Sequence, residues 1–426
     1  MPRMPRGETT MAGARMTDKE DFFANCQYEP EQPFPKAEYD DRLRRVRERM
    51  AKDGVDLLFV GSPDGINYLT GHQVEWYQAQ SPKVWPGTSG VAVHVNKDHY
   101  ILFETVREKL ITQYTTHSTD TRIFPPDTMR DGTAFIAKEL KDSGWITGKV
   151  GLEHWSYRPI RAVSERFEAR FKAAGATVVD ASDILREVRH VKSAAELACI
   201  EKAARIAEAG FEAVRKAIRP GAMELEVYGE MVRALACAGG EVTGLIQPVL
   251  SGQKTGSPHA LSSRKKIKAG DVVAVDLCGV YNRYHLNMAR TFSVGEPMKE
   301  VVEVVNKSVA SLDFIRATLK TGMRLGDFAK ALVGFYEKQG IWENRGWCGG
   351  YEMGIAFPPD WVGNFVFDIL DPFNHDRVFE PNTVMNYENQ FYLPKRQGHF
   401  FQIDSIMFEP KGWKYMSNFQ GGLIVV

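Results

Sequence analysis

The sequence lacks the marks of several classes of protein. Its 426 residues contain no run of the about 18 apolar residues that would indicate a membrane-spanning helix. The first residues, 1–21, are basic and polar and have no apolar stretch of the kind that a signal peptide needs. No glycine-rich phosphate loop follows any of the strands expected below, which argues against a nucleotide site. We therefore expect neither a membrane segment nor a nucleotide cofactor.

Charge of one sign is not in excess either. Lys and Arg together number 54, and so do Asp and Glu, so the formal net charge is zero. A balanced chain is not typical of proteins that bind nucleic acid or anionic membranes. The five cysteines are odd in number and have no paired spacing, which suits a reducing compartment better than a disulfide framework or a zinc site. We expect a cytoplasmic protein with no nucleic-acid partner and no membrane partner.

The first part of the chain alternates between helices and short apolar strands. A chain of 426 residues exceeds what one hydrophobic core usually supports, so two domains are expected. The segment 61–65, Gly-Ser-Pro-Asp-Gly, predicts a turn. The alternation as a whole predicts a three-layer α/β domain. Its expected elements are helices at 37–52 and 135–142 and strands at 55–60, 90–94, 99–103, 149–153 and 177–179.

From about residue 190 the pattern changes to longer helices and longer strands. Apolar residues spaced by three and four between Leu197 and Val214 form one stripe of a long helix. A polar connection, 278–286, is expected between two strands. The order of the elements predicts an α+β domain with an antiparallel sheet. Its further elements are helices at 223–239, 299–319 and 325–339 and strands at 271–277, 287–294, 383–393 and 399–408.

Several passages, taken in their order and spacing, resemble one known family. They are Asp56-Leu57-Leu58, Asn67-Tyr68-Leu69-Thr70-Gly71, Pro258-His259, Lys268-Ala269-Gly270-Asp271-Val272-Val273, Tyr284-His285 with Ala289-Arg290-Thr291, and Phe379-Glu380-Pro381. The chain after residue 37 resembles the creatinase and aminopeptidase P proteins. The resemblance implies an α/β N-terminal domain plus an α+β pita-bread (creatinase-like) C-terminal catalytic domain. The expected boundaries are a flexible N-terminal tail at 1–36, the N-terminal domain at 37–190 and the catalytic domain at 191–426.

Two further passages point to one branch of this family. They are Arg283-Tyr284-His285 and the stretch from Gly350 to Trp361. Both resemble the ectoine hydrolases, which together with creatinase form the metal-free branch. Enzymes of that branch hydrolyse a C–N bond in a small cationic amidine or guanidine. The resemblance also implies a homodimer, in which the small domain of one subunit reaches over the active site of its partner.

Five positions fall where the metallopeptidases of this family place their metal ligands. They are Asp276, Asn287, Tyr351, Glu388 and Gln402, where those enzymes have Asp, Asp, His, Glu and Glu. A two-metal site needs anionic oxygen ligands to neutralise two dications. Asn and Gln offer only neutral carbonyl oxygens, and Tyr, with an ordinary pKa of about 10, is a poor ligand at neutral pH. We therefore expect no metal and no other cofactor.

Three residues are the candidates for catalysis. His259 is expected to act as general base toward water and then as general acid toward the leaving nitrogen, since a free imidazole has a pKa of about 6.5. Glu388 and Asp276 are expected close together, where two carboxylates without a metal need a cationic substrate. Two other roles stay open for Asp276: direct attack on an amidine carbon, or a relic paired with Arg290 or Asn287. Ectoine hydrolases resemble this chain but place Glu, one methylene longer, at this position.

Four more residues are expected to bind substrate or to keep the cavity intact. Tyr351, Asn287 and Gln402 would orient water and substrate, or would complete a polar network left from the metal cavity. Tyr351 would also be able to donate a hydrogen bond to a developing charge. His285 would be a second substrate ligand, or else an exposed loop histidine.

Aromatic and acidic residues near the expected site are candidates for binding a cation. Asp360 would anchor the cation or cap a loop, and Trp361 or Trp85 would offer it an aromatic face. Trp85 lies with Trp76 and Tyr77 in the N-terminal domain, so in the expected homodimer these residues would line the partner's site. Packing in a core or an interface is the alternative for all three.

The leading hypothesis is metal-independent hydrolysis of a C–N bond in a small, polar, cationic metabolite, with His259 as the acid and base. Two alternatives stay open. One is a metal-dependent Xaa-Pro dipeptidase or lyase of the same fold, against which the three neutral ligand positions count. The other is a catalytically inactive pita-bread protein that binds partners. The presence of His259 together with Glu388 favours an enzyme.

Overall fold

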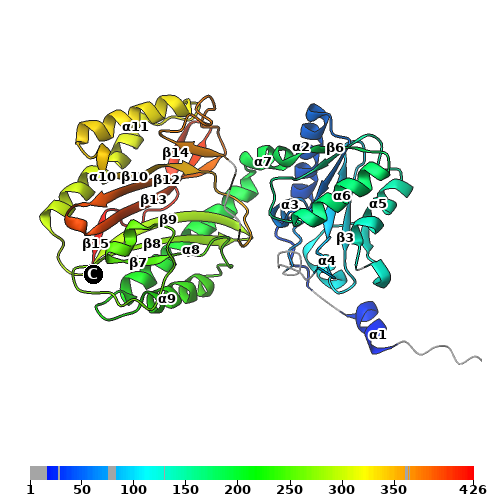
Figure 1. The fold of residues 1–426 in the computed structure, drawn as a ribbon, viewed down its shortest axis with the longest axis horizontal. Coiled ribbons are helices and arrows are strands. Elements are labelled where there is room, and N and C mark those ends of the chain that lie inside the picture. Colours follow the sequence, from blue (N-terminus) through cyan, green and yellow to red (C-terminus); the bar gives the residue numbers. More distant parts are fainter. Residues whose placement is uncertain (1–16, 27–28, 75–82, 129, 360–362, 364) are drawn as a thin grey trace, which may run out of the picture.

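The computed structural model describes residues 17–26, 29–74, 83–128, 130–359, 363 and 365–426. Within these residues the chain forms two domains, each built on one β-sheet (Figure 1). The first sheet has six strands and the second has nine. The α/β plus α+β class that the sequence predicts is confirmed. No helix in the described ranges is long and apolar enough to cross a membrane.

The N-terminal sheet is buried on both faces. Leu57 and Phe59 of strand β1 pack into one core, whereas Leu58 and Val60 pack into another, because successive side chains of a strand point to opposite faces. This double burial explains why the strand reads as an unbroken apolar run. In order across the sheet the strands are β4 (Thr121–Ile123), β3 (Tyr100–Glu104), β2 (Gly90–His94), β1 (Leu57–Val60), β5 (Lys149–Leu152) and β6 (Thr177–Asp180).

Helices cover both faces of this sheet and complete the three layers (Figure 1). Helices α2, α3 and α7 supply apolar residues to the core on the Leu58 side, and α5 and α6 supply them on the Leu57 side. The helices are α2 (Lys36–Asp53), α3 (Pro63–Thr70), α4 (Lys109–Thr115), α5 (Gly132–Asp142), α6 (Arg161–Ala173) and α7 (Ser182–His190), with a 3₁₀ turn at Pro126–Thr128.

Two segments near the N-terminus differ from their prediction. The segment 61–65, predicted as a turn, contains the start of α3: the Ser62 side chain accepts a hydrogen bond from the Gly65 N–H, and Pro63 occupies the first helical position. Within the predicted tail, residues 18–25 form helix α1 (Asp18–Asn25). The Glu31 N–H, also in that tail, donates to the Tyr114 carbonyl oxygen at 2.7 Å and so ties the chain to the N-terminal domain.

The C-terminal sheet is mainly antiparallel and carries its helices on one face. In order its strands are β11 (Val366–Asp368), β10 (Arg345–Tyr351), β12 (Val384–Leu393), β13 (Gly398–Glu409), β9 (Tyr284–Ser293), β8 (Val272–Tyr281) and β7 (Val249–Ser251), with β14 (Gly412–Tyr415) beside β13 and β15 (Leu423–Val425) beside β9. The helices are α8 (Ala194–Ala217), α9 (Glu224–Cys237), α10 (Lys299–Thr318) and α11 (Leu325–Gln339), with 3₁₀ turns at Gly252–Gly256, Trp342–Asn344 and Pro394–Arg396.

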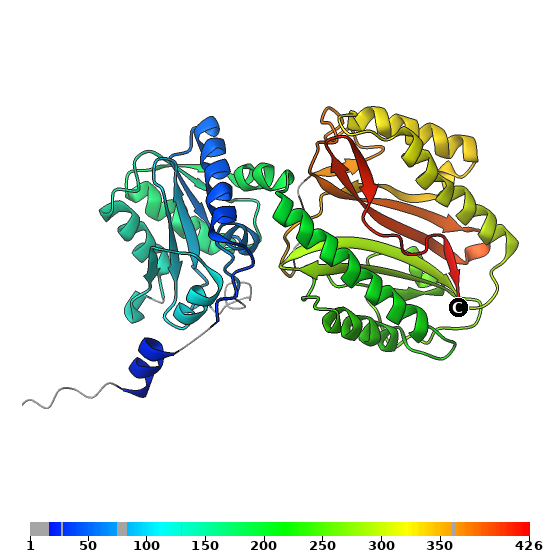
Figure 2. The same ribbon diagram turned by 180° about the vertical axis from the view of Figure 1, so that it is seen from behind.

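The alternation of side chains divides this sheet into a helix-covered face and an open face. Leu277 of β8 packs with the apolar residues of α8, which lies across this face in Figure 2. Phe391 of β12 packs with α10 and α11. Asp276 and Glu388, next to apolar residues in the sequence, therefore point to the open face.

Strands β8 and β9 form a tight hairpin where a polar connection was predicted. Tyr281 pairs with Tyr284, so only Asn282 and Arg283 form the turn. Their φ angles of 49° and 65° match the turn type that suits the twist of a two-residue hairpin. The predicted connection 278–286 is thus wrong, because both strands continue nearly to its middle.

The two domains meet around a buried arginine. Arg42 of α2 donates to the Tyr68 carbonyl oxygen at 2.9 Å and to the Tyr284 hydroxyl at 3.0 Å. The Tyr284 hydroxyl in turn donates to Glu196 of α8 at 2.8 Å. Because Tyr284 opens β9, the N-terminal domain supports the hairpin that carries several predicted site residues.

Candidate active site

Neighbouring strands bring Asp276 and Asn287 together on the open face. Cys278 of β8 lies opposite Asn287 of β9, so Asp276 is the next residue along the same face. The Asn287 side-chain amide donates to Asp276 Oδ1 at 2.7 Å. Arg290, the other partner considered for Asp276, instead binds Asp404 at 2.6 Å on the helix-covered face. Asp276 is therefore held by a neutral amide and not by a cation.

Glu388 of β12 is buried among neutral donors. Its carboxyl group accepts from the Gln390 amide at 2.6 Å, from the Asn386 amide at 3.1 Å and from the Tyr351 hydroxyl. Burial, followed by repulsion from Asp276, raises the pKa of Glu388 to about 8, although the three hydrogen bonds oppose this rise. At neutral pH the carboxyl group therefore retains its proton in most molecules.

Asp276 titrates below Glu388. Burial raises the pKa of Asp276 to about 6, and the hydrogen bond from Asn287 opposes this rise. Because Asp276 loses its proton first, the pair carries about one negative charge at neutral pH. Such a difference between the pKa values of two neighbouring carboxyl groups is typical of sites that need one acid and one base.

Tyr351, at the end of β10, is a hydrogen-bond donor inside the cavity. Burial and the neighbouring Glu388 raise the pKa of its hydroxyl well above the ordinary value, so the phenol stays protonated. Its oxygen lies 3.5 Å from Asn287 Oδ1. A protonated phenol of this kind can stabilise a negative charge that develops on a substrate.

His259 enters the same cavity from an exposed turn. It follows Pro258 just after the 3₁₀ turn Gly252–Gly256 and lines the cavity together with Asp276 and Tyr351. An imidazole here can reach both solvent and a bound substrate. The arrangement therefore supplies a base beside two carboxyl groups, as general acid–base catalysis requires.

His285 is bound to the backbone through both of its ring nitrogens. It lies on β9 and is buried, with 2% of its surface exposed. Nδ1 lies 2.8 Å from the Arg283 carbonyl oxygen, and Nε2 accepts from the Gly244 N–H at 2.9 Å. Burial lowers the pKa of this imidazole to about 3, so it is neutral. Since it is buried on a strand, His285 is not an exposed loop residue. It lines the larger part of the cavity, and its expected contact with a substrate remains a prediction.

Gln402 is not brought together with the other predicted residues. On β13 the residue opposite Glu388 is Ile403, so Ile403 faces the cavity and Gln402 faces the other side of the sheet. There the Gln402 amide donates to Asp404 at 2.9 Å and its oxygen accepts from the Gly422 N–H at 2.8 Å. The prediction erred by one residue, which reverses the face of a strand.

Three predicted substrate contacts are not among the described residues that line the cavity. Asp360 and Trp361 are outside the residues that the structure describes. Trp85, in the N-terminal domain, is half exposed and is not among the residues that line the cavity. Its expected contribution to a partner's site remains a prediction.

Asn386 and Gln390 belong to the site but were not predicted from the sequence. Both lie on the Glu388 face of β12, two residues before and two residues after it. Asn386 also donates to Asn287 Oδ1 at 2.9 Å and so links β12 to β9. The signal was present, because polar residues at every second position of a strand in an apolar region share one face.

Apolar side chains form most of the cavity wall. The cavity has two connected parts of about 390 and 540 Å³, which share Asp276, Tyr351 and His259. The smaller part contains Glu388. Its remaining lining residues are Pro248, Leu250, Pro258, Ala274, Trp347, Val366, Gln390 and Phe401.

The donor set does not suit a two-metal centre. Around Asp276 and Glu388 the other facing positions hold Asn287 and Ile403, one neutral and one apolar. Among the described residues no group of three or more His, Cys, Asp and Glu side chains is placed to hold a metal ion. Two carboxyl groups cannot neutralise two dications, so the residues present do not fit such a centre.

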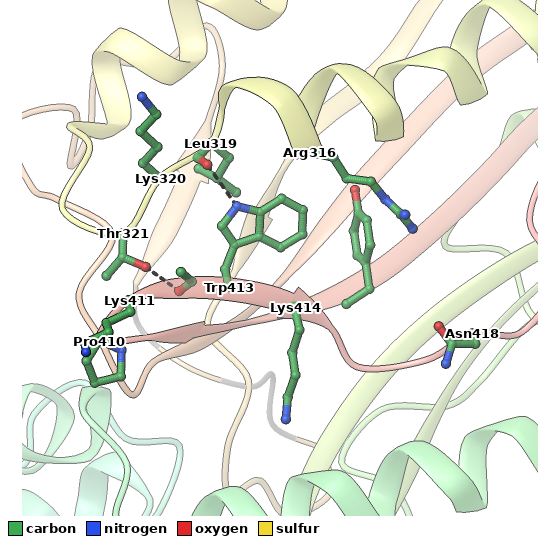
Figure 3. A pocket seen from close by; sticks show the side chains of 11 residues that line it. Arg316, Leu319, Lys320, Thr321, Pro410, Lys411, Trp413, Lys414 and Asn418 are labelled. Carbon is green, nitrogen blue, oxygen red and sulfur yellow. Dashed lines mark hydrogen bonds between the residues drawn. The ribbon is translucent and has the colours of Figure 1, made fainter.

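A second hollow, of about 780 Å³, lies where α10 ends beside β14 (Figure 3). The Trp413 indole N–H donates to the Leu319 carbonyl oxygen there at 2.9 Å. The charged lining residues of this hollow are all basic: Arg316, Lys320, Lys411 and Lys414. Neither a carboxyl group nor a histidine is among its lining residues, and the carboxyl pair and histidine typical of general acid–base catalysis are found together in the cavity beside His259, which is therefore the candidate active site.

Comparison with known proteins agrees with this architecture. The ectoine hydrolase of Halomonas elongata is 26% identical over 351 residues, which cover 77% of this chain and 84% of that protein. The creatinase of a Bacillus species is 25% identical over 404 residues, or 91% of this chain and 92% of the relative. A solved Xaa-Pro dipeptidase from Bacillus anthracis has a TM-score of 0.76 at 20% identity, covering 91% of this chain and 100% of that one.

Two family models cover both domains. The creatinase/prolidase N-terminal domain matches residues 42–191, and metallopeptidase family M24 matches residues 198–410. Together with the solved structure, these matches confirm the predicted resemblance and the two-domain pita-bread architecture. The chain therefore belongs to metallopeptidase family M24, with a creatinase/prolidase N-terminal domain.

Proposed function

We propose that this hydrolase cleaves a C–N bond in a small cationic amidine, guanidine or amide without using a metal ion. The observation that carries the proposal is the pair Asp276 and Glu388, two enclosed carboxyl groups whose hydrogen-bond donors are all neutral, beside His259. The names of two relatives, creatinase and ectoine hydrolase, agree with chemistry of this kind.

A cationic substrate would complete the charge balance of the cavity. Asp276 supplies about one negative charge at neutral pH, and a guanidinium or amidinium group pairs well with a carboxylate through two parallel hydrogen bonds. The bound cation would also favour ionisation of Glu388 and lower its raised pKa. Binding of the cationic substrate would thus neutralise the negative charge of the two carboxyl groups.

In the proposed reaction His259 removes a proton from water, and the water oxygen forms a bond to the central carbon of the amidine. The proton on His259 then passes to the leaving nitrogen as the C–N bond breaks. Tyr351 donates a hydrogen bond to the tetrahedral intermediate. In a second route Asp276 Oδ2 attacks the same carbon, and the C–N bond breaks as the leaving nitrogen takes a proton from His259. His259 then removes a proton from water, whose oxygen attacks the covalent intermediate and releases the Asp276 carboxylate.

A metal-dependent Xaa-Pro dipeptidase is the main alternative. Its support is the likeness to the solved Xaa-Pro dipeptidase, which at 20% identity is a likeness of fold. The neutral and apolar positions Asn287 and Ile403 count against it, because they remove two of the anionic ligands that such a centre needs. A protein that binds partners without catalysis is the third possibility.

A turnover assay before and after chelation tests the proposal. Its substrates are an N-alkylguanidine, an N-alkylamidine, creatine, ectoine and Xaa-Pro dipeptides. We expect chelator-resistant hydrolysis of a cation, lost in the His259→Ala variant and kept in a His375→Ala control. His375 serves as the control because it lies outside the cavity, with Nε2 bonded to the Asp368 carbonyl oxygen. Dipeptide hydrolysis that stops on chelation would establish the peptidase, and inertness under all conditions would favour the binding protein.

The protein is also proposed to act as a homodimer in the cytoplasm. Three apolar residues at the mouth of the cavity, Val242, Ile246 and Leu261, are largely exposed. Apolar groups gathered in this way are typical of a surface that another protein covers. Sedimentation equilibrium would give twice the chain mass for a homodimer, and the chain mass alone would contradict it.

A further inference from the structure

His259 lies on the segment 251–263, which leads from the last residue of β7 toward β8. The first half of this segment is bound to the sheet, because the His399 N–H of β13 donates to Thr255 Oγ1 at 2.8 Å. The second half, which contains His259, has an irregular backbone, and the histidine is exposed. Burial in a core therefore does not fix the imidazole, and irregular segments of this kind open locally at a small cost in free energy.

One buried carboxyl group binds both ends of the segment. Glu224 begins α9 and has 0% of its surface exposed. Its Oε1 accepts from the N–H and the hydroxyl of Ser251 at 2.9 and 2.8 Å. Its Oε2 accepts from the N–H and the hydroxyl of Ser263, both at 3.0 Å. The two oxygens of a single side chain thus bring together the first and the last residue of the segment.

Lys254 extends this contact into the middle of the segment. Its Nζ donates to Glu224 Oε2 at 2.6 Å and to the Leu261 carbonyl oxygen, also at 2.6 Å. Leu261 lies two residues after His259. Glu224 therefore holds the backbone next to the histidine through Lys254, besides holding the ends of the segment directly.

Glu224 is charged in this setting. Burial alone would raise the pKa of its carboxyl group, but the hydrogen bonds from Lys254, Ser251 and Ser263 outweigh burial and hold the pKa below its ordinary value. Lys265 adds a second ammonium group nearby, which donates to Ser251 Oγ at 2.5 Å. Hydrogen bonds to a charged group are about twice as strong as those between neutral groups. Loss of the charge on Glu224 should therefore weaken the closure of the whole segment.

The two carboxyl groups of the cavity are held in a different way. Asp276 and Glu388 lie on β8 and β12, which pair with neighbouring strands along their length. The donors that Glu224 binds belong to the segment 251–263 and not to β8 or β12. A change at Glu224 should thus displace His259 and leave the carboxyl pair in place.

We infer that Glu224 is a positioning residue, which holds His259 at the cavity by binding both ends of the segment 251–263. Glu224 acts through the segment and not on a substrate, since it is fully buried and is not among the residues that line the cavity. When the closure is lost, the entropy of the open segment favours many positions of His259. For the part of His259 in turnover, this inference rests on the proposed function.

The test compares Glu224→Gln with Glu226→Gln in the full chain. A glutamine amide has one oxygen, so it can accept at one end of the segment only, and its NH2 group meets donors at the other end. Glu226 is the matched control, because it lies on the same helix, is exposed and pairs with Arg219 at 3.6 Å.

Two readouts need no substrate. Hydrogen–deuterium exchange of the amides at 252–263 should become at least tenfold faster in Glu224→Gln, while exchange in β8 and β9 stays within about threefold. The second readout is the 13C resonance of His259 in protein labelled at histidine Cε1, assigned by its absence in His259→Ala. It should move toward the shift of an unfolded chain in Glu224→Gln, and both readouts should match the wild type in Glu226→Gln.

Turnover gives a third readout. With the cation that the wild type hydrolyses fastest in the assay above, Glu224→Gln should lower kcat at least tenfold. KM should stay within about threefold, because Asp276 and Glu388 still bind the cation. A general loss of structure would instead raise KM and speed up exchange throughout the sheet.

A milder pair of variants guards against failure of Glu224→Gln to fold. Ser263→Ala removes one hydrogen bond to Glu224 and should speed up exchange at 252–263 about fivefold. Ser257→Ala, an exposed serine of the same segment that does not bind Glu224, should leave this exchange within about twofold.

Unchanged exchange at 252–263, or an unchanged His259 resonance, in Glu224→Gln would overturn the inference. Faster exchange in β8 and β9 to the same degree would overturn it too, because the effect would then not be local. If Glu224→Gln does not fold, equal exchange in Ser263→Ala and Ser257→Ala overturns the inference. A wild type that hydrolyses no cation, or an unchanged kcat beside a displaced His259, contradicts the proposed function and leaves the role of Glu224 standing.

Discussion

The C-terminal sheet buries carboxyl groups on each of its faces: Asp404 on the helix-covered face, and Asp276 with Glu388 on the open face. On the helix-covered face Asp404 pairs with Arg290, and the Arg290 guanidinium is satisfied further by the carbonyl oxygens of Ala289 and Ile403, both at 2.8 Å. On the open face Asp276 and Glu388 have only neutral donors. Asp404 has its cation within the protein, whereas the pair Asp276 and Glu388 has room for a cation from outside. This difference is what separates a structural ion pair from a candidate binding site on the same strands.

The largest expected effect comes from breaking the pair that contains its cation. Arg290→Met would leave Asp404 buried without its cationic partner, and such a loss costs about 3–5 kcal/mol. We expect urea unfolding to show a fall of that size in the free energy of unfolding. Asp276→Asn is the comparison, since it removes a carboxylate that has no cation, and it should leave stability unchanged or higher. A similar loss of stability in both variants would contradict the difference between Asp404, which has a cationic partner, and Asp276, which has none.

The next effect concerns pH. The pKa of Glu388 is 4.5 in the unfolded chain and about 8 in the folded one, so between these values the folded protein binds more protons. Its contribution to stability is present below pH 4.5 and is lost as the pH rises through 8. From pH 5 to pH 8 the wild type should lose about 2–4 kcal/mol more than Glu388→Gln. Urea unfolding at several pH values measures this, and parallel curves for the two proteins would refute it.

A smaller effect is expected on the binding of a guanidinium ligand. The pKa of Asp276 is about 6, so at pH 5 only a minor fraction of molecules carries its negative charge. The Kd should therefore fall about tenfold between pH 5 and pH 8. Calorimetry should also detect proton release in the lower part of this range. A Kd that does not change with pH, or that matches the Kd of Asp276→Asn throughout, would argue against Asp276 as the cation partner.

The smallest effect is expected for Gln402. Because its side chain faces Asp404 and Gly422, Gln402→Ala should leave kcat/KM within about threefold of the wild type and cost about 1 kcal/mol of stability. Gln390→Ala, on the cavity face, should reduce kcat/KM more strongly because it frees the Glu388 carboxyl group. Steady-state kinetics of the two variants would settle which glutamine belongs to the site. The opposite ranking would restore the position that the sequence assigned to Gln402.

The sequence predicted the strands of the site better than their faces. Asp276, Glu388 and His259 were predicted as site residues, and in the structure all three line one cavity. The prediction missed by one residue at Gln402, because spacing along a loop-linked strand does not fix register, and register follows from pairing across the sheet. Pairing depends on contacts between distant segments, which a single sequence does not display.

Local signals explain two other differences. The hairpin at Asn282 was predicted as a longer connection because Cys278 and His285 are polar, although both side chains lie on strands. Ser62 followed by Pro63 is a standard start for a helix, but the neighbouring glycines favoured a turn. Tyr68 and Leu69 are buried against the sheet, and this burial stabilises the helix over the turn.

The most direct test of the account is the metal content of the purified protein, measured together with turnover of an N-alkylguanidine before and after chelation. We predict no stoichiometric metal and turnover that chelation leaves unchanged, because Asp276 and Glu388 would serve the substrate cation instead of a metal. About two equivalents of metal, with activity that chelation abolishes and metal restores, would contradict the account.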